Sequence, residues 1–170
     1  MKLIDLSSHV YSGMMRLPIF PEVAISPIVA TARGDSANVS ELRTPTHAGT
    51  HVDAPFHFVP GGRTIDQISL EQLCGPAVVI PIHRRAEEPI SPEDLAAADV
   101  RPGDIVLLHT GWSEKFETPE YQLHPYLLPE TARWLVEKKA KMLGVDGVNV
   151  DMPIGHRPAD YANPVHRILL

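Results

Sequence analysis

The chain has 170 residues, of which 44% are hydrophobic and 21% are charged, a balance typical of a folded domain and not of a disordered segment. Its formal net charge of −6 and its short, scattered basic clusters argue against a surface that binds nucleic acid. The single cysteine, Cys74, excludes an intrachain disulfide and a zinc site built from cysteines.

Apolar patterns in the first two thirds of the chain predict strands. Short alternations occupy residues 3–10 (LIDLSSHV) and 22–31 (EVAISPIVAT). The runs at 76–82 (PAVVIPI) and 103–111 (GDIVLLHTG) are continuously apolar, which predicts strands covered on both faces inside a sheet. No run approaches the roughly 20 residues that cross a bilayer, and Asp5 comes where a secretory signal would carry basic residues. We therefore expect a cytoplasmic protein without a membrane span.

Helix signals come later in the chain. Ser91 with Asp94 three residues on has the form of a capping box that opens a short helix. The strongest helical pattern covers 129–142, which has lysines near its C-terminal end, and a turn is expected at Gly144. A strand-rich first half followed by mixed elements predicts an α/β or mixed α+β fold in one domain, residues 1–170.

The segment TPTHAGTHVDAPFHF, residues 44–58, gathers His47, His51, Asp53 and His57. On an extended chain all four positions share one face, whereas on a helix His51 and Asp53 would lie about 200° apart. Two imidazoles and one carboxylate are a common ligand set for zinc or manganese. We therefore expect a divalent metal, Zn²⁺ or Mn²⁺, at His47, His51 and Asp53, with His57 beside it as a proton carrier.

Such a site requires the chain to bend, because a straight strand would separate the first and last of these histidines by roughly 33 Å. Gly49 permits unusual backbone dihedral angles and Pro55 imposes a kink, so the bends are expected there. Four aromatic residues are candidates for an apolar wall beside a substrate, although the sequence does not place them: Phe20, Phe56, Phe58 and Trp112.

This segment resembles that of the metal-dependent cyclase-like hydrolases, the family of bacterial kynurenine formamidase and isatin hydrolase. Their segment has the form H-x-G-T-H-x-D-x-P-x-H, and residues 47–57 match every fixed position. Further similar stretches lie at 4–7, 11–14, 103–112 and 144–146. The resemblance implies a swivelling β/β/α fold that assembles into dimers or larger oligomers. It also implies that the first two histidines and the aspartate of the motif bind metal and that the last histidine transfers protons.

The resemblance has one departure, at the C-terminal end. Asn163 and Pro164 look like the cap and first turn of a helix, and His166 matches a family histidine that is followed by two leucines. Family members with two metals complete the second site with this histidine and a later glutamate, which no residue here matches. The resemblance therefore implies one metal at full occupancy or a weak second one, in a chain that lacks the family's C-terminal end. The helix is expected to leave its apolar face incompletely covered unless a neighbouring chain packs on it.

These residues and this resemblance predict a hydrolase that cleaves a small amide, formamide or lactam C–N bond through metal-activated water. His57 is suited to take the proton of the water and return it to the departing nitrogen. The alternative is a noncatalytic metal-binding or structural domain, in which the same residues form a closed site. The expected partners are a small-molecule substrate and further copies of the chain, as a dimer or tetramer, and neither nucleic acid nor a membrane.

Overall fold

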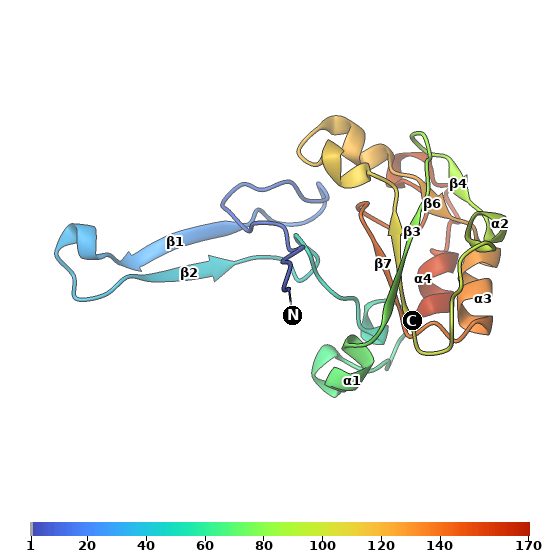
Figure 1. The fold of residues 1–170 in the computed structure, drawn as a ribbon. Coiled ribbons are helices and arrows are strands. Elements are labelled where there is room, and N and C mark those ends of the chain that lie inside the picture. The colour runs from blue at the N-terminus through green and yellow to red at the C-terminus, as the bar shows by residue number, and fades with distance from the viewer. Residues whose placement is uncertain (1) are drawn as a thin grey trace. The chain divides into compact units, whose positions relative to one another are not determined.

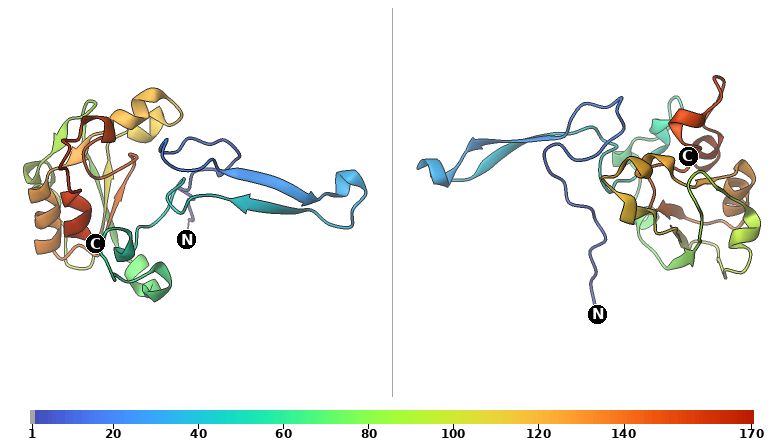
Figure 2. Two further views of the ribbon diagram at one scale, coloured as in Figure 1. Left: turned by 180° about the vertical axis from the view of Figure 1, so that it is seen from behind. Right: turned by 90° about the horizontal axis from the view of Figure 1, so that it is seen from above.

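The structure is a computed structural model that describes residues 2–170 and divides into two compact units, Met1–Asp53 and Ala54–Leu170. The first unit holds a two-stranded sheet, and the second holds a three-stranded and a two-stranded sheet together with short helices (Figures 1 and 2). This mixture confirms the predicted α/β fold class. Among the described residues, no helix combines the length and the apolar character needed to cross a membrane.

The first unit is built on an antiparallel hairpin. Strand β1 (Ala24–Val29) pairs with β2 (Val39–Arg43), and the 3-10 turn η1 (Thr31–Arg33) lies between them. The strand expected within 22–31 is therefore confirmed. Residues 3–10 carry a similar alternation but form no strand, so that prediction is wrong. Alternation decides which side chains share a face, whereas a strand also needs a neighbouring strand for its backbone hydrogen bonds.

The second unit is organised around a parallel sheet with the strand order β3-β5-β7, namely Ala77–Pro81, Ile105–His109 and Met142–Val145. The central strand β5 is mostly buried, as predicted. On the edge strand β3, Ile80 is buried but its neighbour Val79 is 59% exposed, so the prediction of cover on both faces is wrong for β3. A continuous apolar run is thus compatible with an edge strand that has one open face.

Helices α3 (Pro129–Glu137) and α4 (Pro164–Leu169) lie on one side of this sheet (Figure 1). They pack on a core formed by alternate strand residues such as Ile80 and Leu108 and by Leu135 and Val165 of the helices. The remaining elements are short: η2 (Pro55–His57), η3 (Ile65–Gln67), α1 (Leu70–Leu73), β4 (Pro89–Ile90), α2 (Pro92–Leu95), η4 (Trp112–Lys115), η5 (Pro119–Leu123), β6 (Tyr126–Leu127) and η6 (Ile154–His156).

The capping box at the start of α2 is present as predicted, with the Asp94 carboxylate accepting a hydrogen bond of 2.8 Å from the Ser91 N–H. The helix predicted over 129–142 ends at Glu137, because Lys139 adopts a left-handed conformation with φ of 55° that terminates it. The turn expected at Gly144 is absent as well. Gly144 lies inside β7 opposite Leu107, whose Cδ2 atom would be only 2.5 Å from a side chain there.

The predicted C-terminal helix is present as α4. Its residue Val165 is fully buried, and Ile168 and Leu169 are partly buried against the core of the second unit. The chain itself therefore covers much of the apolar face that was expected to remain open. Asn163 occupies the N-cap position and Pro164 the first turn, as predicted, but Asn163 adopts a left-handed conformation and its side chain makes no capping hydrogen bond.

Candidate metal centre

The histidine-rich segment forms an irregular loop between β2 and η2. Gly49 has a φ of 63°, in the left-handed region that glycine adopts without strain, and Pro55 begins the turn of η2. Both residues therefore lie where the chain changes direction, as predicted. The Thr50 hydroxyl accepts a hydrogen bond of 2.9 Å from the Ser8 N–H, which ties this loop to the N-terminal segment of the same unit.

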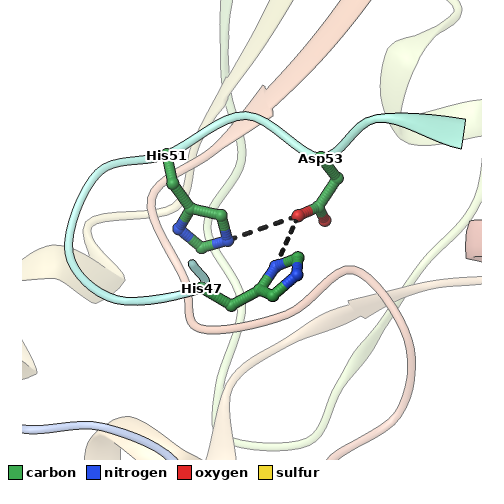
Figure 3. Close-up of side chains that lie close together, drawn as sticks. All are labelled: His47, His51 and Asp53. Atoms are coloured by element: carbon green, nitrogen blue, oxygen red, sulfur yellow. Dashed lines mark ion pairs between the residues drawn. The ribbon is translucent and has the colours of Figure 1, made fainter. Parts of the chain in front are cut away.

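The loop brings His47, His51 and Asp53 together (Figure 3). Asp53 Oδ1 lies 2.8 Å from Nδ1 of His47 and 3.3 Å from Nε2 of His51. The two imidazole rings meet edge to face, with centroids 5.1 Å apart. Their side chains and the carboxylate are 24 to 31% exposed, so the cluster is partly enclosed and still open to solvent. One donor atom from each residue lies within 4.8 Å of the others.

The orientation of His51 is set from its far side. Its Nδ1 lies 2.9 Å from the Gly49 carbonyl, which can only accept, so Nδ1 carries a proton and Nε2 is the nitrogen directed at Asp53. The Asp53 carboxylate raises the pKa of His51, burial opposes the rise and the Gly49 carbonyl adds to it. A metal-binding histidine commonly donates its second N–H to a carbonyl in this way. Two imidazole nitrogens and one carboxylate oxygen thus converge as a donor set that fits a divalent first-row cation.

The four aromatic candidates are placed differently from one another. Phe20 is stacked beside His47, with ring centroids 6.3 Å apart, so it borders the cluster. Phe56 is 62% exposed. Trp112 is 4% exposed and donates its indole N–H to the Tyr121 carbonyl at 3.0 Å, which makes it a packed residue of the second unit.

His57, Phe58 and His166 form a second cluster, within the second unit. The Phe58 ring lies 4.4 Å from that of His57 and 4.3 Å from that of His166, and the two imidazoles are 5.7 Å apart. His57 is exposed on η2, whereas His166 on α4 is only 5% exposed. His166 is therefore a buried residue of the helix and not a residue of its outer surface.

Asp151 contacts His166 and was not singled out from the sequence. Its carboxylate is fully buried and lies 2.5 Å from Nδ1 of His166. Burial by itself raises the pKa of Asp151, but hydrogen bonds from His166, Tyr161 and the Val165 N–H bring the pKa below its usual value. The sequence contains no signal for this pair, because fifteen positions separate the two residues.

Asp146, the last residue of the family-like stretch 144–146, connects the ends of two neighbouring strands. Its carboxylate accepts hydrogen bonds from the Thr110 hydroxyl at 2.5 Å and from the Gly111 N–H at 2.7 Å. These bonds fasten the end of β5 to the end of β7. The family-like stretches 103–112 and 144–146 thus meet in a structural contact between parallel strands.

A family model described as putative cyclase matches residues 4–152. The chain belongs to this cyclase family. The kynurenine formamidase of Geobacillus thermodenitrificans is 32% identical over 137 residues, which are 80% of this chain and 63% of that protein. The kynurenine formamidase of Salinibacter ruber is 31% identical over 174 residues, covering 100% of this chain and 78% of that protein. Isatin hydrolase A from Labrenzia aggregata superposes with a TM-score of 0.82 at 26% identity, over 97% of this chain and 75% of that chain.

These findings confirm the family resemblance that the sequence indicated. The part matched by the cyclase family model includes the loop with His47, His51 and Asp53 and reaches Asp151, whereas His166 lies beyond it. The chain spans 63% of the length of the Geobacillus kynurenine formamidase, so the activity and substrates of the complete relatives are carried to this chain only as a proposal.

Proposed function

We propose that this chain is a metal-dependent hydrolase that cleaves a small amide, formamide or lactam C–N bond, as kynurenine formamidase and isatin hydrolase do. The observation that carries the proposal is the convergence of His47 Nδ1 and His51 Nε2 on one carboxylate oxygen of Asp53, in a chain of the cyclase family. Their distances of 2.8 and 3.3 Å match a donor set that needs only small adjustments to enclose a cation.

The cation in this proposal is Zn²⁺ or Mn²⁺, held by His47, His51 and Asp53. Three protein ligands leave coordination positions for water and substrate, which is typical of catalytic sites. A bound divalent cation supplies a water of lowered pKa and polarises a carbonyl oxygen. The Gly49 carbonyl keeps His51 in the tautomer that directs Nε2 to this place.

His57 is the proposed proton carrier. It follows Asp53 by four residues, a stretch that spans at most about 14 Å, and its imidazole is exposed on η2. In the proposed reaction a water oxygen bonds to the amide carbon and the C–N bond breaks. His57 accepts the proton of the water and donates it to the departing nitrogen, so that a carboxylic acid and an amine result.

The position of Phe20 supports the proposal of an aromatic substrate. Its ring is stacked beside His47 at a centroid distance of 6.3 Å and at an angle of 29° between the planes. An aryl group of the substrate can stack or pack edge to face against such a ring. Aryl formamides and lactams fused to a benzene ring, such as isatin, are therefore the proposed substrate class.

A homodimer or larger oligomer is also part of the proposal. In the hairpin of the first unit, Ile25 lies opposite Leu42, and their side chains are 39% and 56% exposed. Isolated two-stranded hairpins are marginally stable in water, and adjoining exposed apolar residues favour an interface.

We also propose a cytoplasmic location, since the thiol of Cys74 is free and exposed, as is common in reducing compartments.

A metal and turnover experiment separates this proposal from a noncatalytic metal-binding domain. Protein purified without added metal is analysed for its metal content and then assayed with N-formylkynurenine and isatin in the presence of Zn²⁺ or Mn²⁺. We expect hydrolysis of at least one of them that is lost in His51→Ala and retained in His83→Ala, a change of an exposed histidine outside the site. Bound metal without turnover of any aryl amide or lactam would favour the noncatalytic alternative.

A further inference from the structure

We propose that Asp151 is a positioning residue that holds the His166 imidazole in one orientation and in one tautomer, with the proton on Nδ1. The other ring nitrogen, Nε2, then carries the lone pair, the state in which an imidazole can act as a metal ligand. The inference rests on the proposed function in this one respect, because it takes the chain to be a metal-binding hydrolase. The tautomer itself is a property of the metal-free chain.

The hydrogen bonds around Asp151 determine which nitrogen of His166 is protonated. Oδ1 accepts from the Tyr161 hydroxyl at 2.8 Å and from the Val165 N–H at 3.1 Å. Oδ2 accepts from the His166 N–H at 3.1 Å and lies 2.5 Å from Nδ1 of the same residue. Tyr161 itself accepts from the Met152 N–H, so its own proton is directed to Asp151. Each of these neighbours is a donor to an acceptor-only carboxylate, and Nδ1 must be one as well.

The start of α4 explains why this carboxylate is needed at this place. Pro164, at the first position of the helix, has no N–H, and Asn163 makes no side-chain cap because its amide oxygen accepts from Arg157 at 2.8 Å. The first available N–H groups of the helix, on Val165 and His166, are bound by Asp151. Asp151 therefore holds both the backbone and the side chain of His166.

Asp151 has two roles that its hydrogen bonds distinguish: it caps the helix, and it positions the imidazole of His166. Capping requires only the two backbone N–H groups, which lie 3.1 Å from the carboxylate. The additional bond to Nδ1 is shorter, at 2.5 Å, and joins side chains that are 0 and 6% exposed. Hydrogen bonds to an ionised carboxylate are the shorter and stronger kind. Phe58 lies against the same imidazole at a centroid distance of 4.3 Å and restricts its rotation.

The first test measures the tautomer in the metal-free wild-type chain. Long-range ¹H–¹⁵N NMR correlations report which ring nitrogen of each histidine carries a proton, and the signals of His166 are assigned by their loss in His166→Gln. We expect a single Nδ1–H tautomer. A proton on Nε2, or an average of the two tautomers, would overturn the proposal without any need for a variant of Asp151.

The second test compares Asp151→Asn with two matched controls. Tyr161→Phe removes another hydrogen bond to the same carboxylate, and Ser91→Ala removes the hydroxyl that donates to Asp94 at 3.2 Å in the capping box of α2. We expect Asp151→Asn to lose the single tautomer of His166. The two controls should lower the melting temperature but keep the single tautomer. Equal changes of the tautomer in all three variants would reduce Asp151 to a structural residue.

The metal arm of the second test uses titration of the metal-free chain with Zn²⁺ and Mn²⁺ against a chromophoric chelator. The cation whose binding is lost in His166→Gln should bind about 10- to 100-fold more weakly in Asp151→Asn. A change of less than twofold, or a wild-type chain without any His166-dependent cation, would contradict the role in metal binding. Failure of the proposed function would be seen in other measurements: the wild-type chain would turn over no substrate, and His51→Ala would keep its metal.

Discussion

Asp53 Oδ1 lies 2.8 Å from Nδ1 of His47, although a loop with a left-handed turn at Gly49 separates the two residues along the chain. The same oxygen lies 3.3 Å from Nε2 of His51. One carboxylate oxygen therefore contacts two imidazoles whose rings stand nearly perpendicular to each other, at 88°. This arrangement requires the bend at Gly49 and has the donors of a metal site.

The first prediction concerns metal content. His51→Ala and Asp53→Ala should each lose most of the bound divalent metal, because either change removes one of three converging donors. Elemental analysis of protein purified without added metal measures the ratio of metal to chain. His83→Ala serves as the control and should keep the wild-type ratio. An unchanged ratio in both site variants would show that the metal is bound elsewhere.

The second prediction separates proton transfer from metal binding. His57→Ala should lower turnover by about 10²- to 10⁴-fold, the usual contribution of a positioned acid or base, while most of the metal stays bound. Steady-state kinetics and elemental analysis are carried out on the same preparation. Near-normal turnover would eliminate His57 as the proton carrier, and complete loss of metal would make it a ligand instead.

The third prediction is a loss of stability in mild acid that is caused by His124. Its side chain is buried, and burial, with a smaller contribution from Arg157, lowers the pKa of His124 from 6.5 to about 4. The unfolded chain therefore binds a proton at a pH where the folded chain does not, and stability falls as the pH drops from about 6.5 towards 4. The full effect is on the order of 3 kcal/mol in the free energy of unfolding.

Urea unfolding of the metal-free chain at several pH values measures this effect, because bound metal would add a pH dependence of its own. In His124→Gln the decrease between pH 6.5 and 4.5 should become smaller, whereas the same change at the exposed His83 should leave it as in the wild type. Parallel pH profiles of wild type and His124→Gln would assign the acid sensitivity to other groups.

The fourth prediction tests the hairpin as an interface between copies of the chain. Leu42→Glu places a charge among exposed apolar side chains of β1 and β2 and should shift the chain towards monomers, because a buried charge at an interface is costly. Light scattering coupled to size-exclusion chromatography measures the mass. Ser26→Lys, at an exposed polar position on the other face of the hairpin and opposite Glu41, is the control. The same oligomer in Leu42→Glu would place the interface elsewhere.

Local features of the fold could be predicted from the sequence because neighbouring residues suffice to form them. The capping box of Ser91 and Asp94 closes over three residues, and β1 within 22–31 pairs with β2, which follows it closely in the chain. The predictions failed where a distant partner decides the outcome. Residues 3–10 pair with neither strand of the hairpin in their own unit, and Gly144 is part of β7 because β5 lies beside it, with Leu107 opposite.

The same distinction applies to the two histidine clusters. The sequence by itself determined the set His47, His51 and Asp53, since seven residues with a flexible glycine among them can turn back on themselves and bring their donors together. Only the tertiary structure decided that Asp151 binds His166. Their contact exists because the loop after β7 returns to the start of α4, where a helix without its own side-chain cap leaves two N–H groups for a buried carboxylate.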